Sequence, residues 1–103
     1  MIRHIVMWKL KEHAEGADRQ ANMQKVRQLL EDCRDCVPGM LEFEIGLASE
    51  GCEATYDVVL NSLFESREAL EAYQVHPRHV ASKPLMSAVR TERQCMDYEL
   101  PAR

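Results

Sequence analysis

The sequence predicts a single α+β domain in which helices cover one face of a four-stranded antiparallel sheet. A length of 103 residues leaves room for one domain with one core, so we place its bounds at 1–103. An apolar fraction of 46% and a charged fraction of 29% are ordinary for a globular protein. Apolar residues also repeat with strand and helix spacing in the order β-α-β-β-α-β, which predicts the fold class.

The first predicted strand covers residues 2–10, which are rich in β-branched and aromatic side chains. Successive side chains of a strand point to opposite faces, so His4 shares one face with Val6 and Trp8. We expect this face to pack against the helices. A histidine ring there must find a hydrogen-bond partner or line a pocket.

The first predicted helix follows Asp18, whose carboxylate can accept hydrogen bonds from the free N–H groups of a helix start. Pro38 and Gly39 end the helical pattern, because proline lacks the N–H donor. Between them, apolar residues recur at intervals of three and four, which predicts one buried helix face. This face consists of Met23, Val26, Leu29, Leu30, Cys33 and Val37.

A hairpin is predicted next, with strands over residues 40–48 and 55–65 and a turn that contains Gly51. Apolar side chains alternate along both strands, so one face of the hairpin is expected to be buried. That face consists of Leu41, Phe43, Ile45 and Leu47 from the first strand and Tyr56, Val58, Leu60 and Phe64 from the second.

The second half of the chain predicts two helical stretches and a closing strand. Ser66 is expected to cap a helix over residues 67–75. A second helical stretch over residues 78–89 is expected to be interrupted by Pro84, and residues 94–100 form the closing strand. The resulting β-α-β-β-α-β order is the ferredoxin-like arrangement.

The sheet face away from the helices is predicted to be half apolar, and such a face favours a partner. A second copy of the chain is the simplest one, so we expect a homodimer through this face. Its apolar members are Ile5, Met7, Val59 and Leu63, set among Glu42, Glu44, Asp57 and Asn61.

The charge pattern and the absence of targeting motifs restrict the partners and the location. The 13 basic residues are scattered among 17 acidic ones, giving a net charge of −4, which argues against a nucleic-acid partner. No apolar run approaches the roughly 20 residues that cross a membrane. The N-terminal segment is too charged for a signal peptide, so we expect a cytoplasmic protein with free thiols. No nucleotide-binding motif is present, and we expect no cofactor.

Five motifs recur together in this order in one known family. They are MIRHIVMWKL at residues 1–10, VPG at 37–39, YD at 56–57, ALEAYQVHPRHV at 69–80 and DYE at 97–99. Together they resemble the stress-responsive A/B barrel (Dabb) domain family over essentially the whole chain. The resemblance implies a ferredoxin-like subunit whose sheet packs against that of a second subunit to form a dimeric α/β barrel. It also implies that the role is undefined, since members range from proteins linked to stress to a few polyketide cyclases.

In the cyclases, a tyrosine and a histidine that match Tyr73 and His79 act together in an aldol condensation. The resemblance implies that the histidine moves the proton while the tyrosine hydroxyl holds the polarised carbonyl. Our main expectation is a homodimer that binds a small apolar or aromatic molecule between sheet and helices, linked to stress response. The alternative is a cyclase-like enzyme with His79 as general acid and base and Tyr73 as its hydrogen-bonding partner.

The candidate site residues are therefore Tyr73 and His79 for catalysis and His4, His76 and Trp8 for ligand binding. Histidine suits proton transfer because its unperturbed pKa is about 6.5. A structural interpretation stays open: the histidines can cap a helix or bond a buried carbonyl, and the two aromatic rings can be core. Three histidines can also hold zinc, but no suitably spaced carboxylate supports this, so we expect no metal.

Overall fold

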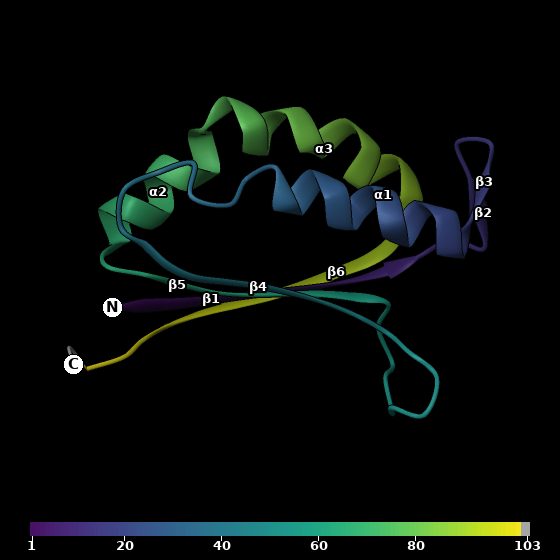
Figure 1. Cartoon of the computed structure of the whole chain (residues 1–103), viewed down its shortest axis with the longest axis horizontal. Coiled ribbons are helices and arrows are strands. Elements are labelled where there is room, and N and C mark those ends of the chain that lie inside the picture. Colours follow the sequence, from purple (N-terminus) through teal and green to yellow (C-terminus); the bar gives the residue numbers. More distant parts are fainter. Residues whose placement is uncertain (102–103) are drawn as a thin grey trace.

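The computed structural model describes residues 1–101 and has a layer of helices on one face of a four-stranded sheet (Figure 1). The last two residues of the predicted domain, Ala102 and Arg103, lie outside the described residues. The elements in chain order are β1 (Ile2–Leu10), β2 (His13–Ala14), β3 (Ala17–Asp18), α1 (Arg19–Glu31), β4 (Met40–Leu47), β5 (Val58–Phe64), α2 (Arg67–Val75), α3 (Pro77–Val89) and β6 (Arg90–Glu99).

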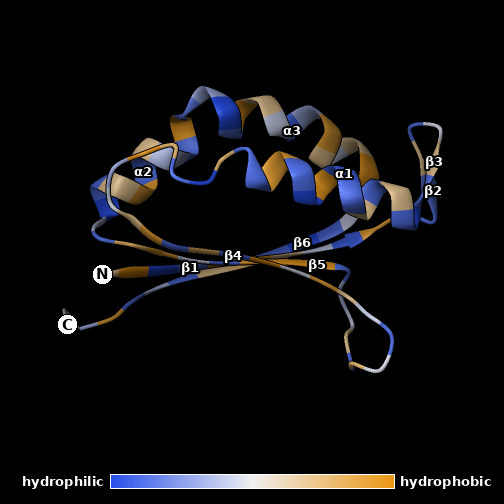
Figure 2. Cartoon of the chain, in the orientation of Figure 1, coloured by the Kyte–Doolittle hydropathy of each residue, from blue (hydrophilic) through white to orange (hydrophobic). Residues whose placement is uncertain are grey.

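The sheet has the strand order β4-β5-β1-β6, and every neighbouring pair is antiparallel. This confirms the predicted ferredoxin-like arrangement, in which the first and third long strands lie at the centre. All three helices lie on the same side of the sheet, and no element covers the other side within residues 1–101 (Figures 1 and 2). The sheet therefore has one helix-covered face and one open face.

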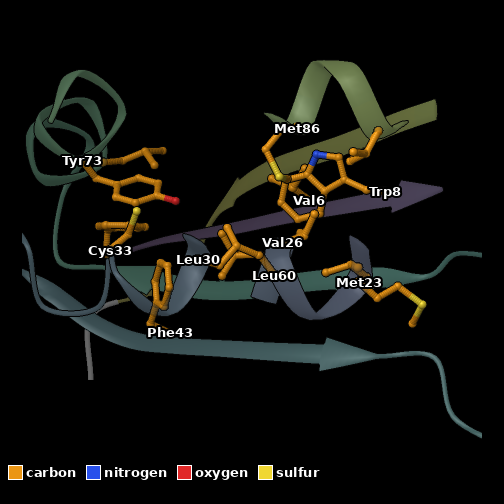
Figure 3. Packing of buried hydrophobic residues seen from close by; sticks show 14 of the residues in the cluster. Val6, Trp8, Met23, Val26, Leu30, Cys33, Phe43, Leu60, Tyr73 and Met86 are labelled. Atoms are coloured by element: carbon orange, nitrogen blue, oxygen red, sulfur yellow. The ribbon is translucent and has the colours of Figure 1, made fainter. Parts of the chain in front are cut away.

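The hydrophobic core lies between the sheet and the helices, as predicted. His4, Val6 and Trp8 all point to this side of β1 and are buried, so the predicted strand face is confirmed. In Figure 3, Tyr73 and Phe43 lie toward one end of the packed side chains, and Trp8 lies toward the other. The core thus extends from side chains of α2 and β4 at one end to side chains of the second half of β1 at the other.

Both predicted helix caps are present. The Asp18 carboxylate accepts a hydrogen bond from the backbone N–H of Ala21 (2.8 Å), and the Ser66 hydroxyl accepts one from that of Ala69 (3.2 Å). However, α1 ends at Glu31, earlier than its apolar stripe predicts. Residues 33, 34 and 36 instead donate to the carbonyl three residues back. Asp35 then has a positive φ of 57°, which a helix does not allow.

Three strand predictions need correction. Leu41 is 51% exposed, because a register shift between Met40 and Glu42 leaves it as the extra residue of a β-bulge. The third long strand begins at Val58 instead of residue 55. The side chain of the preceding residue, Asp57, makes a hydrogen bond to β1, in which its carboxylate accepts from the Leu10 N–H (2.7 Å). The closing strand begins at Arg90, four residues before the predicted start, directly after α3.

Two further features differ from the sequence prediction. The helix α3 continues through Pro84, so this residue does not interrupt it. A short hairpin, β2-β3, precedes α1, and its turn residues Glu15 and Gly16 have positive φ values of 52° and 74°. The Asn22 side chain donates to the carbonyl of Ala14 (3.0 Å), which holds the hairpin against α1.

The open face of the sheet carries the predicted mixture of apolar and polar side chains. Ile5, Met7 and Val59 are partly exposed there, and β6 adds Met96, which is 65% exposed, and Tyr98, which is 38% exposed. Leu63 also belongs to this face by its position in β5, but it is completely buried. Within residues 1–101, none of the helices is long and apolar enough to span a membrane.

Candidate functional site

A cavity of about 530 Å³ lies between the sheet and the helices. Four of the five residues singled out in the sequence contribute to its lining: His4 and Trp8 from β1, Tyr73 from α2 and His79 from α3. The fifth, His76, does not. The remaining lining residues are Val6, Leu30, Leu60, Gln74, Val75, Ser82, Lys83, Met86, Ser87, Arg90 and Arg93.

Local structure explains how these side chains come together. The two-residue period of β1 puts His4 and Trp8 on its helix-facing side. Helix α3 starts at Pro77, immediately after His76, and its spacing of three and four residues turns His79, Ser82, Lys83, Met86 and Ser87 to the same side. The α2-α3 corner therefore places the His79 ring against the Tyr73 ring, with 4.7 Å between their centroids.

The surroundings of His79 determine which ring nitrogen is available for chemistry. Its Nδ1 lies 2.9 Å from the carbonyl oxygen of Gln74. A carbonyl only accepts hydrogen bonds, so Nδ1 carries the hydrogen and Nε2 keeps its lone pair. Burial is the main cause that lowers the pKa of His79, and this favours the neutral ring. His79 is thus suited to accept a proton at Nε2 near neutral pH.

The surroundings of Tyr73 make it a hydrogen-bond donor. Its ring is 1% exposed and packs edge-on or tilted against His4, Phe43, Phe64 and His79. Burial strongly raises the pKa of Tyr73, so the phenol stays protonated. Its hydroxyl makes no hydrogen bond to any part of residues 1–101. A bound carbonyl or carboxyl oxygen would give this hydroxyl the partner that buried hydroxyls normally have.

His4 is held by Asp97, which was not among the predicted site residues. Its Nδ1 lies 2.5 Å from the carboxylate of Asp97, which sits directly opposite His4 in the β1-β6 pairing. An ionised carboxylate only accepts, so Nδ1 donates and Nε2 is left for the cavity. The Asp97 motif was visible in the sequence, but its contact with His4 depends on the strand register.

His76 has a structural position instead of the expected place in the pocket. Its Nδ1 accepts a hydrogen bond from the backbone N–H of Arg78 (3.1 Å), which caps the start of α3. Pro77 occupies the first position of that helix, where its missing N–H costs nothing. His76 and His79 therefore face different surroundings, although only three positions separate them.

Three basic residues of the lining were not singled out in the sequence: Lys83, Arg90 and Arg93. Lys83 could have been predicted, because it follows His79 by four residues and so lies on the same face of the helix. The two arginines lie between the predicted helix, which ended at residue 89, and the predicted strand, which began at residue 94. Their position in the lining depends on the early start of β6.

The described part of the chain holds no group of three or more His, Cys, Asp or Glu side chains placed to bind a metal ion. The Cys33-x-x-Cys36 pair lies just beyond α1 as free thiols. Burial raises the pKa of Cys33 to about 11 and also raises that of Cys36. These shifts disfavour the thiolate, whereas a redox or nucleophilic cysteine needs a lowered pKa.

We therefore expect the thiols to be dispensable for folding. Cys33→Ala and Cys36→Ser should each lower the free energy of unfolding by no more than about 2 kcal/mol. Cys33 should cost more, because it is completely buried in the core whereas Cys36 is only partly buried. Urea denaturation monitored by circular dichroism measures both effects. Unfolding of either variant together with loss of stoichiometric zinc would contradict this expectation.

Comparison with known proteins places the chain in a family. The family model described as the stress responsive A/B barrel domain matches residues 2–100. Among curated proteins no match is found.

Solved structures share the fold over nearly the whole chain. A dimeric protein of unknown function with a ferredoxin-like fold from Bacteroides fragilis is 25% identical, with a TM-score of 0.78 over 96% of this chain and 95% of its own. A Dabb family protein with a ferredoxin-like fold from Mesorhizobium loti is 22% identical, with a TM-score of 0.70 over 98% of this chain and 97% of its own. A structure described as an antibiotic biosynthesis monooxygenase is 17% identical, with a TM-score of 0.71 over 99% of this chain and 100% of its own.

The family match spans every strand and helix described above, including the elements that line the cavity. The chain belongs to the stress responsive A/B barrel (Dabb) domain family.

Proposed function

We propose that this protein binds a small apolar or aromatic molecule in the cavity between sheet and helices. The observation that carries the proposal is the cavity itself, whose volume of about 530 Å³ falls within the range of about 300–1,000 Å³ typical of small-molecule sites. Apolar walls from Trp8, Leu60 and Met86 surround a few polar groups, as such sites require. We further propose that binding of this ligand is linked to a stress response and that the protein is cytoplasmic.

We further propose that the protein acts as a homodimer through the open sheet face. This face carries partly exposed apolar side chains from β1, β5 and β6 that no element of residues 1–101 covers. The Bacteroides fragilis structure with the same fold is described as dimeric. Because the cavity lies on the opposite side of the sheet, dimer formation leaves it available for a ligand.

The ligand can be tested with the single tryptophan of the chain, Trp8, which lines the cavity. At a concentration of 100 times its Kd, a bound molecule should stabilise the protein by about 2.7 kcal/mol and raise Tm by roughly 10–20 °C. The same titration should change the fluorescence of Trp8. Thermal shifts with unchanged Trp8 fluorescence, or no shift across a broad panel of aromatic compounds, would contradict the proposal.

A second candidate function is proton transfer on a bound aromatic or polyketide-like carbonyl compound. It is favoured by the pairing of a free His79 Nε2 with an unpartnered Tyr73 hydroxyl on adjacent rings. In this reaction, Nε2 removes a proton from the carbon next to the carbonyl, and the electron pair moves onto the carbonyl oxygen. The Tyr73 hydroxyl stabilises that oxygen by donating a hydrogen bond.

This candidate predicts exchange of the α-hydrogens of a bound aryl ketone in D₂O, which NMR measures directly. Tyr73→Phe should slow the exchange by about 100-fold if the hydroxyl supplies oxyanion stabilisation. The variant keeps the buried ring, so binding should change much less. Equal exchange rates in Tyr73→Phe, the parent protein and buffer would refute this second candidate function. Ligand binding would then remain as the proposed function.

A further inference from the structure

Basic residues gather along one part of the cavity. Three of the chain's 13 Lys and Arg residues contribute to the lining, and none of its 17 Asp and Glu residues does. His4 and His79 line the same cavity, but burial favours the neutral ring of His79 and His4 is bonded to Asp97, so the cavity's positive charge comes from the Lys and Arg side chains. The chain as a whole has a net charge of −4, so the cavity has the opposite sign to the protein around it.

The three cations come from two elements that meet at the Trp8 end of β1. Lys83 lies one helical turn after His79 on α3. Arg93 pairs directly with Trp8 in the β1-β6 register, and Arg90 ends α3. They therefore line the same cavity as the apolar wall that Trp8 provides.

No acidic side chain of the described residues neutralises these cations. Lys83, Arg90 and Arg93 make no side-chain hydrogen bond or ion pair within residues 1–101. The carboxylates that share the helix-facing side of β6 are engaged elsewhere, Asp97 with His4 and Glu99 with Arg67. Glu92 points to the open face and pairs with Lys9.

The cations of the lining also act on His79, which lines the same cavity. Burial is the largest cause of the lowered pKa of His79; the hydrogen bond to Gln74 opposes the shift, and the charges of Lys83, His4 and Arg93 add to it. Mutually repelling cations without a carboxylate form a site that an anion stabilises. Arginine is suited to this role because its guanidinium binds carboxylate and phosphate oxygens in pairs.

We propose that the ligand is an amphipathic anion, with an aromatic or apolar body and one acidic oxygen group. The body packs against Trp8, Leu60 and Met86, and the acidic group binds Lys83, Arg90 and Arg93. This inference rests on the proposed function, since it specifies the class of molecule that the same cavity binds. It goes beyond that proposal because shape alone does not distinguish an acid from a neutral compound.

The test compares matched pairs of probes that differ only in charge. Cinnamate and cinnamamide form one pair, and larger aromatic acids with their amides form the others. Each acid should bind the parent protein at least about tenfold more tightly than its amide, the effect of one or more charge-assisted hydrogen bonds. The difference should shrink at high salt, because the site is open to solvent on the side of Arg93. A further pair, phenyl phosphate and phenol, shows whether the site prefers a phosphate ester to a carboxylic acid.

Variants of Arg93 and Lys83, with Lys25 as the control, show which cations cause the preference. Arg93→Gln should lose most of the preference for the acid while binding the amide as before. Lys25→Gln is the matched control, because Lys25 is an exposed cation of α1 outside the lining, and it should keep the preference. Unfolding of Arg93→Gln is not expected, since its side chain is exposed and unpaired; Lys83→Gln provides the same measurement from α3.

The outcomes separate this inference from the function on which it rests. Equal binding of acids and amides to the parent protein would overturn the anionic ligand and leave the cavity as a site for neutral molecules. A preference that persists in both Arg93→Gln and Lys83→Gln would also overturn it. Failure of every acid and every amide to bind would refute the proposed function as well.

Discussion

Replacing Met96 by Asp is expected to convert the proposed homodimer into a monomer. In light scattering at micromolar concentration, the parent protein should have about twice the chain mass of 11.9 kDa, and the variant should have the mass of one chain. The reason is that Met96 lies opposite Ile5 and so adjoins the apolar part of the open sheet face. Two-fold symmetry would bury a carboxylate from each subunit there, at a cost of several kcal/mol per ion.

Met96 is chosen because it is already 65% exposed in the single chain. The substitution therefore leaves the fold of the subunit intact, and its circular dichroism spectrum should match that of the parent. Val80→Asp is the control, since Val80 is an apolar residue of α3 that is 48% exposed on the helix side of the sheet. It should remain dimeric. A parent protein that is already monomeric, or a Met96→Asp variant with the dimer mass, would show that another surface is used.

Periodicity was sufficient to predict the architecture. The alternation along residues 2–10 placed His4 and Trp8 on the helix-facing side, and the structure has them there. The caps at Asp18 and Ser66 were also predictable, because each needs only a side-chain oxygen two or three residues before a free N–H. These features depend on local sequence, which explains why they could be inferred without coordinates.

The missed features depend on backbone detail or on pairing between distant residues. A one-residue bulge exposes Leu41, although the alternating pattern around it is unbroken. Pro84 remains in α3 because the packing of the helix against the core outweighs the loss of one hydrogen bond. The His4–Asp97 contact joins residues 93 positions apart in the sequence. No local pattern reports such a contact.

The sequence predicted which residues belong to the candidate site better than it predicted what each of them does. Tyr73 and His79 were expected to share a pocket, and both line the same cavity. His76 is just as conspicuous in the sequence, two residues before Arg78 and three before His79, but the first turn of α3 directs it away. The two histidines therefore differ in the direction of the backbone that carries them. Their alanine variants form a matched pair for testing ligand binding.

Replacing His79 by Ala is expected to abolish ligand binding while leaving a folded protein. The ring forms part of the cavity wall, packs on Tyr73 and has an Nε2 without a hydrogen-bond partner within residues 1–101. Loss of binding should be at least about tenfold, and any proton-transfer activity should disappear with it. The variant also leaves the Gln74 carbonyl without its donor, so the free energy of unfolding should fall by about 1–3 kcal/mol.

His76→Ala separates the role in binding from the loss of stability. It removes a helix cap, at an expected cost of about 1 kcal/mol, and does not alter the cavity lining. The two variants should therefore lose similar stability, but only His79→Ala should lose the ligand-induced rise in Tm. Isothermal titration with the best aromatic ligand, beside urea denaturation of each variant, measures both quantities. If both variants retained the parent affinity, His79 would be a structural residue, and its bond to Gln74 would be the reason for its position.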